Sequence, residues 1–304
     1  MKINVQKRFT LDGHKDCLYA LTSGDRPAVL YSASGDGMVV AWDLQNPENG
    51  RLLARMKNSV YALAFLTGQN TLLAGQNFEG IHFIDTIHQK EVASLELEKN
   101  QIYDIKIHED RAYIGTGDGV LYVMDLQTRS LVKRVKLSDK SIRAIAINSG
   151  LNDIALGLSD NSIRILSLPD LTQKLVINAH KLSVFALQYD PRTNMLLSAS
   201  RDAHLKRWDS ANNYQLEKSV VAHTYAINTI SLSPDGQLFA TGSMDKTIKV
   251  WDTKTMTLLK VIDRSRHAGH TSSVNKVLWT NHENLLISCG DDKNIIVWDL
   301  GVNY

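Results

Sequence analysis

Cysteine is scarce in this chain of 304 residues, where Cys17 and Cys289 stand far apart and outside any metal-binding or redox motif. We expect both to be free thiols, which favours a reducing compartment and predicts a cytoplasmic protein. Long apolar runs are also missing. The sequence contains no stretch of about 18 apolar residues, the length that predicts a transmembrane helix. The opening MKINVQKRFT turns polar too early for a signal peptide.

An excess of one charge is likewise missing. The sequence holds 34 Lys and Arg residues against 32 Asp and Glu residues, which gives a net charge of +2. A balanced chain has no overall attraction for nucleic acid or for an anionic membrane, so neither is expected as a partner. The composition carries no information about self-association.

Motifs of known catalytic and cofactor sites are missing too, among them phosphate-binding Gly-rich loops, nucleophile elbows and HExxH. We therefore predict no enzymatic activity, no catalytic residue, no cofactor and no metal. Two stretches leave a question open. Residues 263–270, DRSRHAGH, are the nearest candidate for a metal or phosphate site, because His267 and His270 are three apart with Arg264 and Arg266 nearby. An extended surface loop is the simpler interpretation. Residues 129–143 are basic, which indicates either a solvated outer strand or a docking site for an acidic partner.

What the sequence does contain is one motif repeated seven times. The segments are of equal length and end at Asp43, Asp85, Asp125, Ser167, Asp209, Asp252 and Asp299. The sixth reads ATGSMDKTIKVWD, a strand, a turn with an Asp, and a second strand that ends in Trp-Asp. The interval between successive ends is nearly constant and slightly longer at the last step, and a period of about 40–45 residues is typical of four-stranded propeller blades.

A second column of residues keeps step with the first. His14, His180, His223 and His270 each precede a Trp at the same spacing, namely Trp42, Trp208, Trp251 and Trp298. The other three repeats have Met56, Glu96 and Ser138 in the His column and Ile84, Met124 and Leu166 in the Trp column. Because His and Trp are present or absent together, we interpret them as one physical unit.

These repeats resemble the WD-repeat (WD40) β-propeller family over nearly the whole chain. The resemblance implies an all-β fold, a seven-bladed β-propeller of four-stranded antiparallel blades. It also implies a hydrogen-bonded network in each complete blade that joins the loop His, a strand Ser or Thr, the turn Asp and the Trp indole. The network residues expected are His14, Ser34, Asp36, Trp42, His180, Ser200, Asp202, Trp208, His223, Ser243, Asp245, Trp251, His270, Asp292 and Trp298.

Two features of these networks can be anticipated. Gly290 stands in the Ser column of the last repeat, so we expect that network to be incomplete or closed by water. A His and an Asp beside a Ser also invite a catalytic-triad interpretation. Four copies at equivalent positions argue against it, because a catalytic site is normally singular.

The ends of the chain suggest how the propeller closes. The sequence stops just after the third strand of the seventh repeat, and residues 2–11 are left over before the first His. The family resemblance implies that residues 2–11 supply the outer strand of blade seven, so that no large sheet edge stays open. We therefore expect residues 1–304 to form a single propeller domain.

One further column predicts where partners bind. The residue after the first apolar position of each inner strand is Tyr19, Tyr61, Tyr103, Arg143, Phe185, Asn228 or Asn275. In the family this column surrounds the mouth of the central channel, on the face that carries the His loops, and Arg201 before a turn Asp faces the same way. Aromatic residues and Arg dominate binding hot spots. The predicted partner-binding residues are Tyr19, Tyr61, Tyr103, Arg143, Phe185 and Arg201. The alternative is that they only fill the channel end and pack on one another.

These observations predict a non-enzymatic scaffold that binds a protein or peptide of unknown identity around the channel mouth. The alternative is a ligand- or metal-binding propeller, a sensor or an enzyme that uses the central channel. That alternative needs several polar side chains converging on the axis, and the suitable columns offer only Asn228 and Asn275, with Asp104 nearby. A nucleic-acid binder using residues 129–143 is the weakest interpretation, because the net charge is balanced.

Overall fold

The computed structural model describes residues 2–168 and 170–303, most of which lie in β-strands and the turns between them. The described strands form seven four-stranded antiparallel sheets. These sheets are the blades of a seven-bladed β-propeller, so the predicted all-β fold is confirmed. The chain divides into two compact parts, a first part up to Lys99 and again from Ile230 onward, and a second part over Asn100–Thr229.

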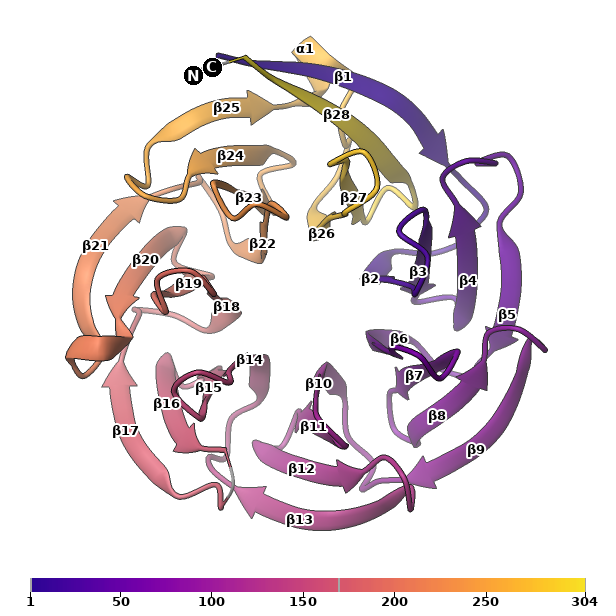
Figure 1. Ribbon diagram of the computed structural model, residues 1–304, viewed down its shortest axis with the longest axis vertical. Coiled ribbons are helices and arrows are strands. Elements are labelled where there is room, and N and C mark those ends of the chain that lie inside the picture. The colour runs from indigo at the N-terminus through magenta and orange to yellow at the C-terminus, as the bar shows by residue number, and fades with distance from the viewer. Residues whose placement is uncertain (1, 169, 304) are drawn as a thin grey trace. The chain divides into compact units, whose positions relative to one another are not determined.

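The first part holds blades one, two and seven and most of blade six (Figure 1). Blade one is β2 (Leu18–Ser23), β3 (Val29–Ser34), β4 (Met38–Asp43) and β5 (Arg51–Arg55), and blade two is β6 (Val60–Leu66), β7 (Thr71–Gln76), β8 (Gly80–Asp85) and β9 (Lys90–Glu96). Blade six is β22 (Ile227–Leu232), β23 (Leu238–Ser243), β24 (Ile248–Asp252) and β25 (Leu258–Ile262), followed by helix α1 (Arg264–His267). Blade seven is β26 (Val274–Trp279), β27 (Leu286–Gly290), β28 (Ile295–Asn303) and β1 (Lys2–Leu11).

The second part holds blades three, four and five. Blade three is β10 (Ile102–His108), β11 (Arg111–Thr116), β12 (Val120–Asp125) and β13 (Ser130–Lys136). Blade four is β14 (Ile142–Asn148), β15 (Asp153–Leu158), β16 (Ser162–Ser167) and β17 (Gln173–Asn178). Blade five is β18 (Val184–Tyr189), β19 (Leu196–Ser200), β20 (His204–Asp209) and β21 (Gln215–Val221), with the short 3-10 helix η1 (Ser210–Asn212) before its last strand.

Blade seven is built from both ends of the chain. Strand β1 runs antiparallel to β28, from Lys2 opposite Asn303 to Leu11 opposite Ile295 (Figure 1). Ile3 packs with Ile248 and other side chains of blade six, and Leu11 packs in the core beside Trp42 of blade one. The N-terminal strand therefore supplies both a hydrogen-bonded edge and two apolar anchors to the first part. That residues 1–304 behave as one domain stays a prediction.

Burial follows the position of each strand within its blade. All six residues of β3 and of β15 are buried, because both faces of these strands are covered by neighbouring blades. The outer strands are mostly exposed, and β13 has no fully buried residue. Function at an outer strand would therefore rest on exposed side chains, whereas the inner strands present their ends and turns.

Candidate functional site

Blades one, five and seven each contain a complete network of Trp, hydroxyl, His and Asp. In blade one, Trp42 Nε1 donates to Ser32 Oγ at 2.8 Å, and the same oxygen lies 2.8 Å from His14 Nε2. His14 Nδ1 lies 3.2 Å from Asp36 Oδ2. Blades five and seven repeat these contacts at closely similar distances, through Trp208, Ser198, His180 and Asp202 and through Trp298, Ser288, His270 and Asp292.

The protonation state of this network follows from its partners. The Asp36 carboxylate can only accept, so His14 carries its proton on Nδ1 and accepts from Ser32 through Nε2. Burial lowers the pKa of His14 and of His180, although the adjacent Asp opposes the shift. Burial works to raise the pKa of Asp36, but the backbone N–H groups of Lys15 and Met38 and the His14 ring lower it overall. The network is a neutral imidazole held against a carboxylate that also caps the turn.

The hydroxyl in this network is not the one that the sequence predicted. Ser34, Ser200 and Ser243 were expected in it, and this expectation is wrong. Trp42 pairs with Leu30 across the sheet, and Ser32 is the next residue on that face, whereas Ser34 is a further two residues away. Ser34 instead donates to the Asp16 carbonyl at 3.0 Å and accepts from Asp36 N at 3.2 Å. The network hydroxyls are Ser32, Ser198, Thr241 and Ser288.

The assignment of the hydroxyl two residues earlier also completes the network of blade seven. We expected its network to be incomplete because Gly290 lacks a hydroxyl, but Ser288 makes both bonds at 2.8 Å. In blade six Trp251 Nε1 donates to Thr241 Oγ1 at 2.9 Å, and the His223 side chain is buried. Blade four keeps a loop-to-turn bond without a His, because Ser138 Oγ donates to Asp160 at 2.7 Å. Sequence reasoning missed that bond.

Burial bears on the catalytic-triad interpretation. The side chains of His14, His180 and His270 are at most 1% exposed. A nucleophile at this position would have no route to a substrate, and each bond that a general base would need is already used within the fold. The geometry is that of a structural tie between loop and turn.

The predicted binding column has a structural signature that the sequence does not reveal. In blades one to five and in blade seven, the pairing of the two innermost strands shifts by one residue, and the residue left over in the bulge is the column residue. These residues are Tyr19, Tyr61, Tyr103, Arg143, Phe185 and Asn275. A bulge breaks the alternation of faces and re-aims its extra side chain. Each of the six is half-buried at the end of its strand.

In the first part, the column residues of neighbouring blades lie against each other. The Tyr19 and Tyr61 rings meet edge to face, with centroids 4.5 Å apart and planes at 65°. Asn275 donates through Nδ2 to the Leu18 carbonyl at 3.0 Å and to Asp291 Oδ1 at 2.6 Å. Burial raises the pKa of Tyr19, so its hydroxyl stays protonated and can donate.

In the second part, the column forms a stack of a cation between two rings. The Arg143 guanidinium lies 3.8 Å from the Tyr103 ring centroid and 4.8 Å from that of Phe185. Arg201 is exposed on the turn between β19 and β20, and its N–H donates to the Ser183 carbonyl at 2.9 Å. The structure thus brings Tyr103, Arg143 and Phe185 together. The backbone of Arg201 is bonded to Ser183, which lies two residues before Phe185 in the sequence.

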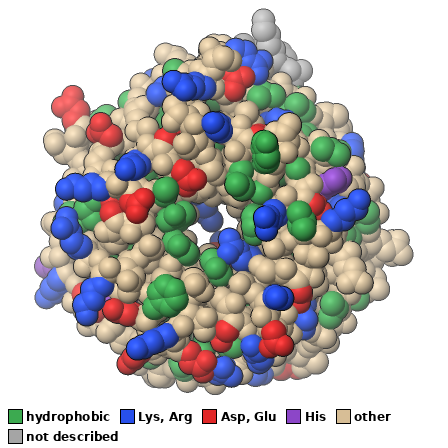
Figure 2. Space-filling model, turned by 180° about the vertical axis from the view of Figure 1, so that it is seen from behind, with side chains coloured by type: hydrophobic (Ala, Val, Ile, Leu, Met, Phe, Trp, Pro, Cys, Tyr) green, Lys and Arg blue, Asp and Glu red, His purple; other side chains and the backbone are tan. Residues whose placement is uncertain are grey.

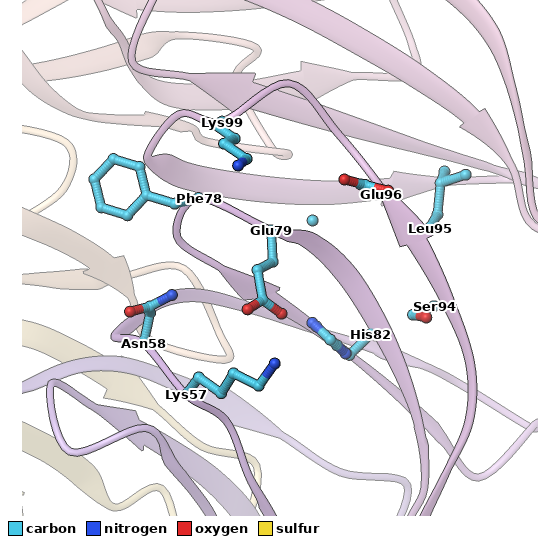
Figure 3. Close-up of a pocket in the computed structure, with 10 residues that line it drawn as sticks. Lys57, Asn58, Phe78, Glu79, His82, Ser94, Leu95, Glu96 and Lys99 are labelled. Atoms are coloured by element: carbon cyan, nitrogen blue, oxygen red, sulfur yellow. The ribbon is translucent and has the colours of Figure 1, made fainter.

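Blade two lacks the network and contains a pocket near the place where the network would lie. Met56, Ala74, Phe78 and Ile84 occupy the positions of His, hydroxyl, Asp and Trp in this blade. A cavity of about 560 Å³ opens beside Phe78, lined by the loop of Lys57 and Asn58, the turn of Phe78 to Gly80, His82, and residues 94–96 and Lys99. Figure 3 shows Lys57, Glu79 and Lys99 directing their charged ends toward it.

The turn beside this pocket is strained. Phe78 has a φ of +67°, a left-handed conformation that a bulky side chain rarely adopts, and the side chain is 45% exposed. Position 80 requires glycine, because a Cβ there would lie 2.1 Å from the Leu95 carbonyl oxygen. An exposed aromatic held in an unfavourable conformation marks this turn as a second place of functional interest.

The two open stretches have ordinary structural roles. In residues 263–270, Asp263 caps helix α1 and pairs with Arg266 at 2.5 Å, while His270 serves its network. In residues 129–143, Lys136 donates to the Asp118 carbonyl at 2.6 Å, and the Arg134 guanidinium lies over the Tyr122 ring.

Among residues 2–168 and 170–303, no three His, Cys, Asp or Glu side chains are arranged to hold a metal ion. Among the helices described, none has the length and apolar character needed to cross a membrane. Basic and acidic side chains are interspersed on the face in Figure 2, in keeping with the near balance of charge.

Comparison with known proteins agrees with this architecture. The family model described as WD domain, G-beta repeat (WD40) matches residues 5–43, 171–209, 214–252 and 262–299, about half of the chain. The four segments end at Asp43, Asp209, Asp252 and Asp299, so each covers one of the blades that have both His and Trp.

Similar proteins come from distant organisms. Protein tipD of Dictyostelium discoideum is 25% identical over 97% of this chain and 48% of its own length. Actin-interacting protein 1 of Caenorhabditis elegans is 24% identical over 95% of this chain and 47% of its own length. Target of rapamycin complex subunit LST8 of Bos taurus is 22% identical over 83% of this chain and 81% of its own length. The chain spans about half the length of the first two. With seven blades, repeated networks and four matched segments, the chain belongs to the WD40 repeat family.

Proposed function

We propose that this protein is a non-enzymatic scaffold that binds protein segments at the strand ends carrying the bulged column residues. The observation that carries the proposal is the bulge itself. A side chain that only filled space could stay in register, whereas six bulges each direct a column residue away from the regular alternation. Four of the six are aromatic and one is Arg, the residue types that dominate binding hot spots.

Contacts within each part support binding over simple filling. Tyr19 and Tyr61 fix each other's orientation in the first part, and Arg143 is held between Tyr103 and Phe185 in the second. Side chains that are already ordered lose less conformational entropy when a partner binds. The packing that the alternative interpretation expected is therefore present, and it preorganises the same residues for binding.

The names of the relatives fit a role in protein interaction. One is an actin-interacting protein and another is a subunit of a complex. For this chain we propose protein partners as a class, without transferring either named partner. We also propose a cytoplasmic location, because Cys17 and Cys289 are free thiols.

Site-specific photocrosslinking tests the proposal. A benzophenone side chain would replace Tyr61 in the first part, Phe185 in the second, and Val132 on the exposed outer strand β13 as the matched control. We expect crosslinked protein adducts in cell extract from positions 61 or 185 and fewer from 132. Adducts confined to position 132 would place the interaction on the outer edge and refute the column assignment.

The pocket of blade two favours a second candidate function, the binding of a small ligand. A volume of about 560 Å³ lies within the usual range of about 300–1,000 Å³ for ligand sites. This site lies at blade two rather than on the axis that the sequence suggested. Screening metabolites by thermal shift against the protein and its Glu79→Gln variant tests it. A stabilising compound whose effect the variant abolishes supports the function, and the lack of any such compound counts against it.

A further inference from the structure

The cavity of blade two lies entirely within the first part of the chain. The loop before β6, the turn between β7 and β8, and the paired strands β8 and β9 surround it. Ser94 lies opposite His82 in the pairing of these two strands, and Glu96 lies opposite Gly80. One wall of the cavity is therefore a hydrogen-bonded sheet, which fixes where the side chains of β8 and β9 start.

Charged side chains of both signs face this cavity. Lys57 and Lys99 supply two ammonium groups, and Glu79 and Glu96 supply two carboxylates. In Figure 3 the charged ends of Lys57 and Glu79 lie in the lower half of the view, and those of Lys99 and Glu96 lie in the upper half. Each half of the view thus contains one cation and one anion.

These four groups are not neutralised by direct contact with one another. Across residues 2–168 and 170–303, none of the four side chains makes a hydrogen bond or an ion pair. Glu91 Oε1 lies 3.2 Å from His82 Nδ1 in the wall, although the two atoms are not aligned for a hydrogen bond. Two cations and two anions are therefore left to face a ligand.

Flanking residues do not tip this balance toward either sign. Glu91 and Glu98 add two acids on β9 and in the loop after it, and Arg55 adds a cation at the end of β5. The Arg55 guanidinium donates to Met38 Sδ at 3.6 Å. A purely anionic ligand would be attracted to the lysines and repelled by the glutamates, and a purely cationic ligand would meet the reverse. A ligand that carries both charges gains from both sets.

The cavity also offers apolar surface and enough room for an organic ligand. Phe78 is 45% exposed and Leu95 is half-buried, and both line the cavity. The volume of about 560 Å³ is that of a site for an organic molecule rather than for a single ion. A hydrocarbon side chain on the ligand can contact Phe78 and Leu95 while its charged groups reach the Lys and Glu side chains.

We infer that this cavity binds a small zwitterion, an amino acid or a short peptide whose ammonium and carboxylate are both free. The ligand ammonium pairs with Glu79 and Glu96, and the ligand carboxylate pairs with Lys57 and Lys99. The inference rests on the second candidate function, the binding of a small ligand in blade two, and it names the chemical class of that ligand.

Binding of the common amino acids and of their dipeptides with glycine, measured on the full chain by isothermal titration calorimetry, tests this inference. Each compound that binds is then compared with its N-acetyl form, which lacks the ammonium, and with its C-terminal amide, which lacks the carboxylate. We expect each blocked form to bind at least tenfold more weakly than the parent compound. The amino-acid and dipeptide sets also show which of the two sources the cavity prefers.

Variants locate the two charges of the ligand. The double variant Glu79→Gln, Glu96→Gln should weaken the parent compound at least tenfold and leave the N-acetyl form unchanged, because the ammonium that these residues bind is already missing. The double variant Lys57→Gln, Lys99→Gln should do the same for the C-terminal amide.

The matched control is the double variant Glu48→Gln, Lys90→Gln, which removes two exposed charges of the first part that do not line the cavity. It should change every affinity less than twofold. Circular dichroism melting of each variant separates loss of binding from loss of fold.

The outcomes distinguish this inference from the function on which it rests. A blocked form that binds as tightly as its parent, yet loses affinity in either cavity variant, would overturn the zwitterionic class and keep a ligand site in blade two. Equal binding to all variants would place the compound elsewhere and overturn the inference. If no amino acid or dipeptide binds, the inference is wrong, and the wider metabolite screen decides the ligand-binding function by itself.

Discussion

At the scale of single residues, one buried hydroxyl joins the two halves of each network. Ser32 Oγ accepts from Trp42 and donates to His14, so its loss leaves two buried polar atoms without a partner at once. Unsatisfied buried groups of this kind cost about 1–3 kcal/mol each. The hydroxyl is therefore as important to the network as the His and Trp that mark it in the sequence.

Blade seven offers the sharpest test of this role. Ser288→Ala should lower the free energy of unfolding by about 2–6 kcal/mol, because Trp298 and His270 both lose their partner. Urea denaturation measures the change. Ser94→Ala on the exposed outer strand β9 is the control and should stay within about 0.5 kcal/mol of the parent. Equal stability of the two variants would contradict a working network in blade seven.

A network residue could be predicted from the sequence only where a single candidate residue occupies its position. His and Trp keep a constant spacing wherever both occur, so their pairing could be predicted. The hydroxyl was ambiguous, because blades one, five and six each carry two hydroxyl residues on one face of the same strand, as Ser32 and Ser34 do in blade one. Only blade seven distinguishes them, since Ser288 is present where Gly290 lacks a side chain. We interpreted Gly290 as a defect of blade seven, although its lack of a hydroxyl identifies Ser288 as the network residue.

The strained Phe78 supports a second residue-scale prediction. At a φ of +67°, a β-branched side chain should be strongly disfavoured, whereas Asn tolerates the left-handed region. We expect Phe78→Asn to be more stable than Phe78→Val by about 1 kcal/mol, although Val is the more apolar residue. Thermal melting of both variants measures the difference. The opposite order would show that burial, rather than backbone strain, dominates at this turn.

At the scale of elements, the networks act as ties between loops and turns, and their charge state makes them sensitive to pH. The folded-state pKa of His14 and of His180 is lowered by burial, so the unfolded chain binds more protons as the pH falls below about 6.5. Stability from this source is complete above that pH and is lost below it. The lowered pKa values of Asp36 and Asp292 act in the same direction below about pH 4.

We therefore expect the melting temperature to stay nearly level down to about pH 6.5 and then to fall towards about pH 5, before the carboxylates begin to titrate. Differential scanning calorimetry at several pH values measures this slope. The double variant His14→Asn, His180→Asn removes both imidazoles, and its melting temperature should be lower at pH 7.5 but less dependent on pH. A parent curve that is flat or rises as the pH falls would contradict neutral, buried histidines.

The pairing of β1 with β28 gives the second prediction at this scale. Removing residues 2–11 exposes an edge of β28 and deletes the buried side chains of Ile3 and Leu11. We expect aggregation or a large loss of stability, because an open edge invites pairing with other chains. Size-exclusion chromatography and melting report the result. A shortened protein that stays monomeric and melts at the parent temperature would show that β1 adds little.

The bulges mark the limit of sequence reasoning for elements. The inner strands could be predicted from runs such as VYALAF and IRAIAI, whose apolar character on both faces indicates a covered sheet. The one-residue shift at Tyr61 and Arg143 could not, because a bulge inserts a residue without changing the local composition. The column was therefore chosen by family resemblance, and its aim became visible only in the structure.

At the scale of the whole molecule, the proposed function rests on the contrast between the strand ends and the outer edges of the blades. Seven similar blades give one chain many strand ends with different side chains. The outer strands are exposed and basic in places, as β13 is, but Lys136 there is engaged with the Asp118 carbonyl. We therefore expect specificity to come from the column, and the outer charges to affect mainly the salt dependence of binding.

The most direct test of this account is the affinity of a partner, found by crosslinking, for two sets of variants. Phe185→Ala and Arg201→Ala should each weaken the complex by about 2 kcal/mol or more, which is at least tenfold in Kd, while the fold is kept. The outer-strand variant Lys133→Ala, Arg134→Ala should bind almost as the parent does and lose only some salt dependence. Isothermal titration calorimetry at two salt concentrations measures both. Loss of binding in the outer-strand variant, with parental affinity in the column variants, would contradict the account.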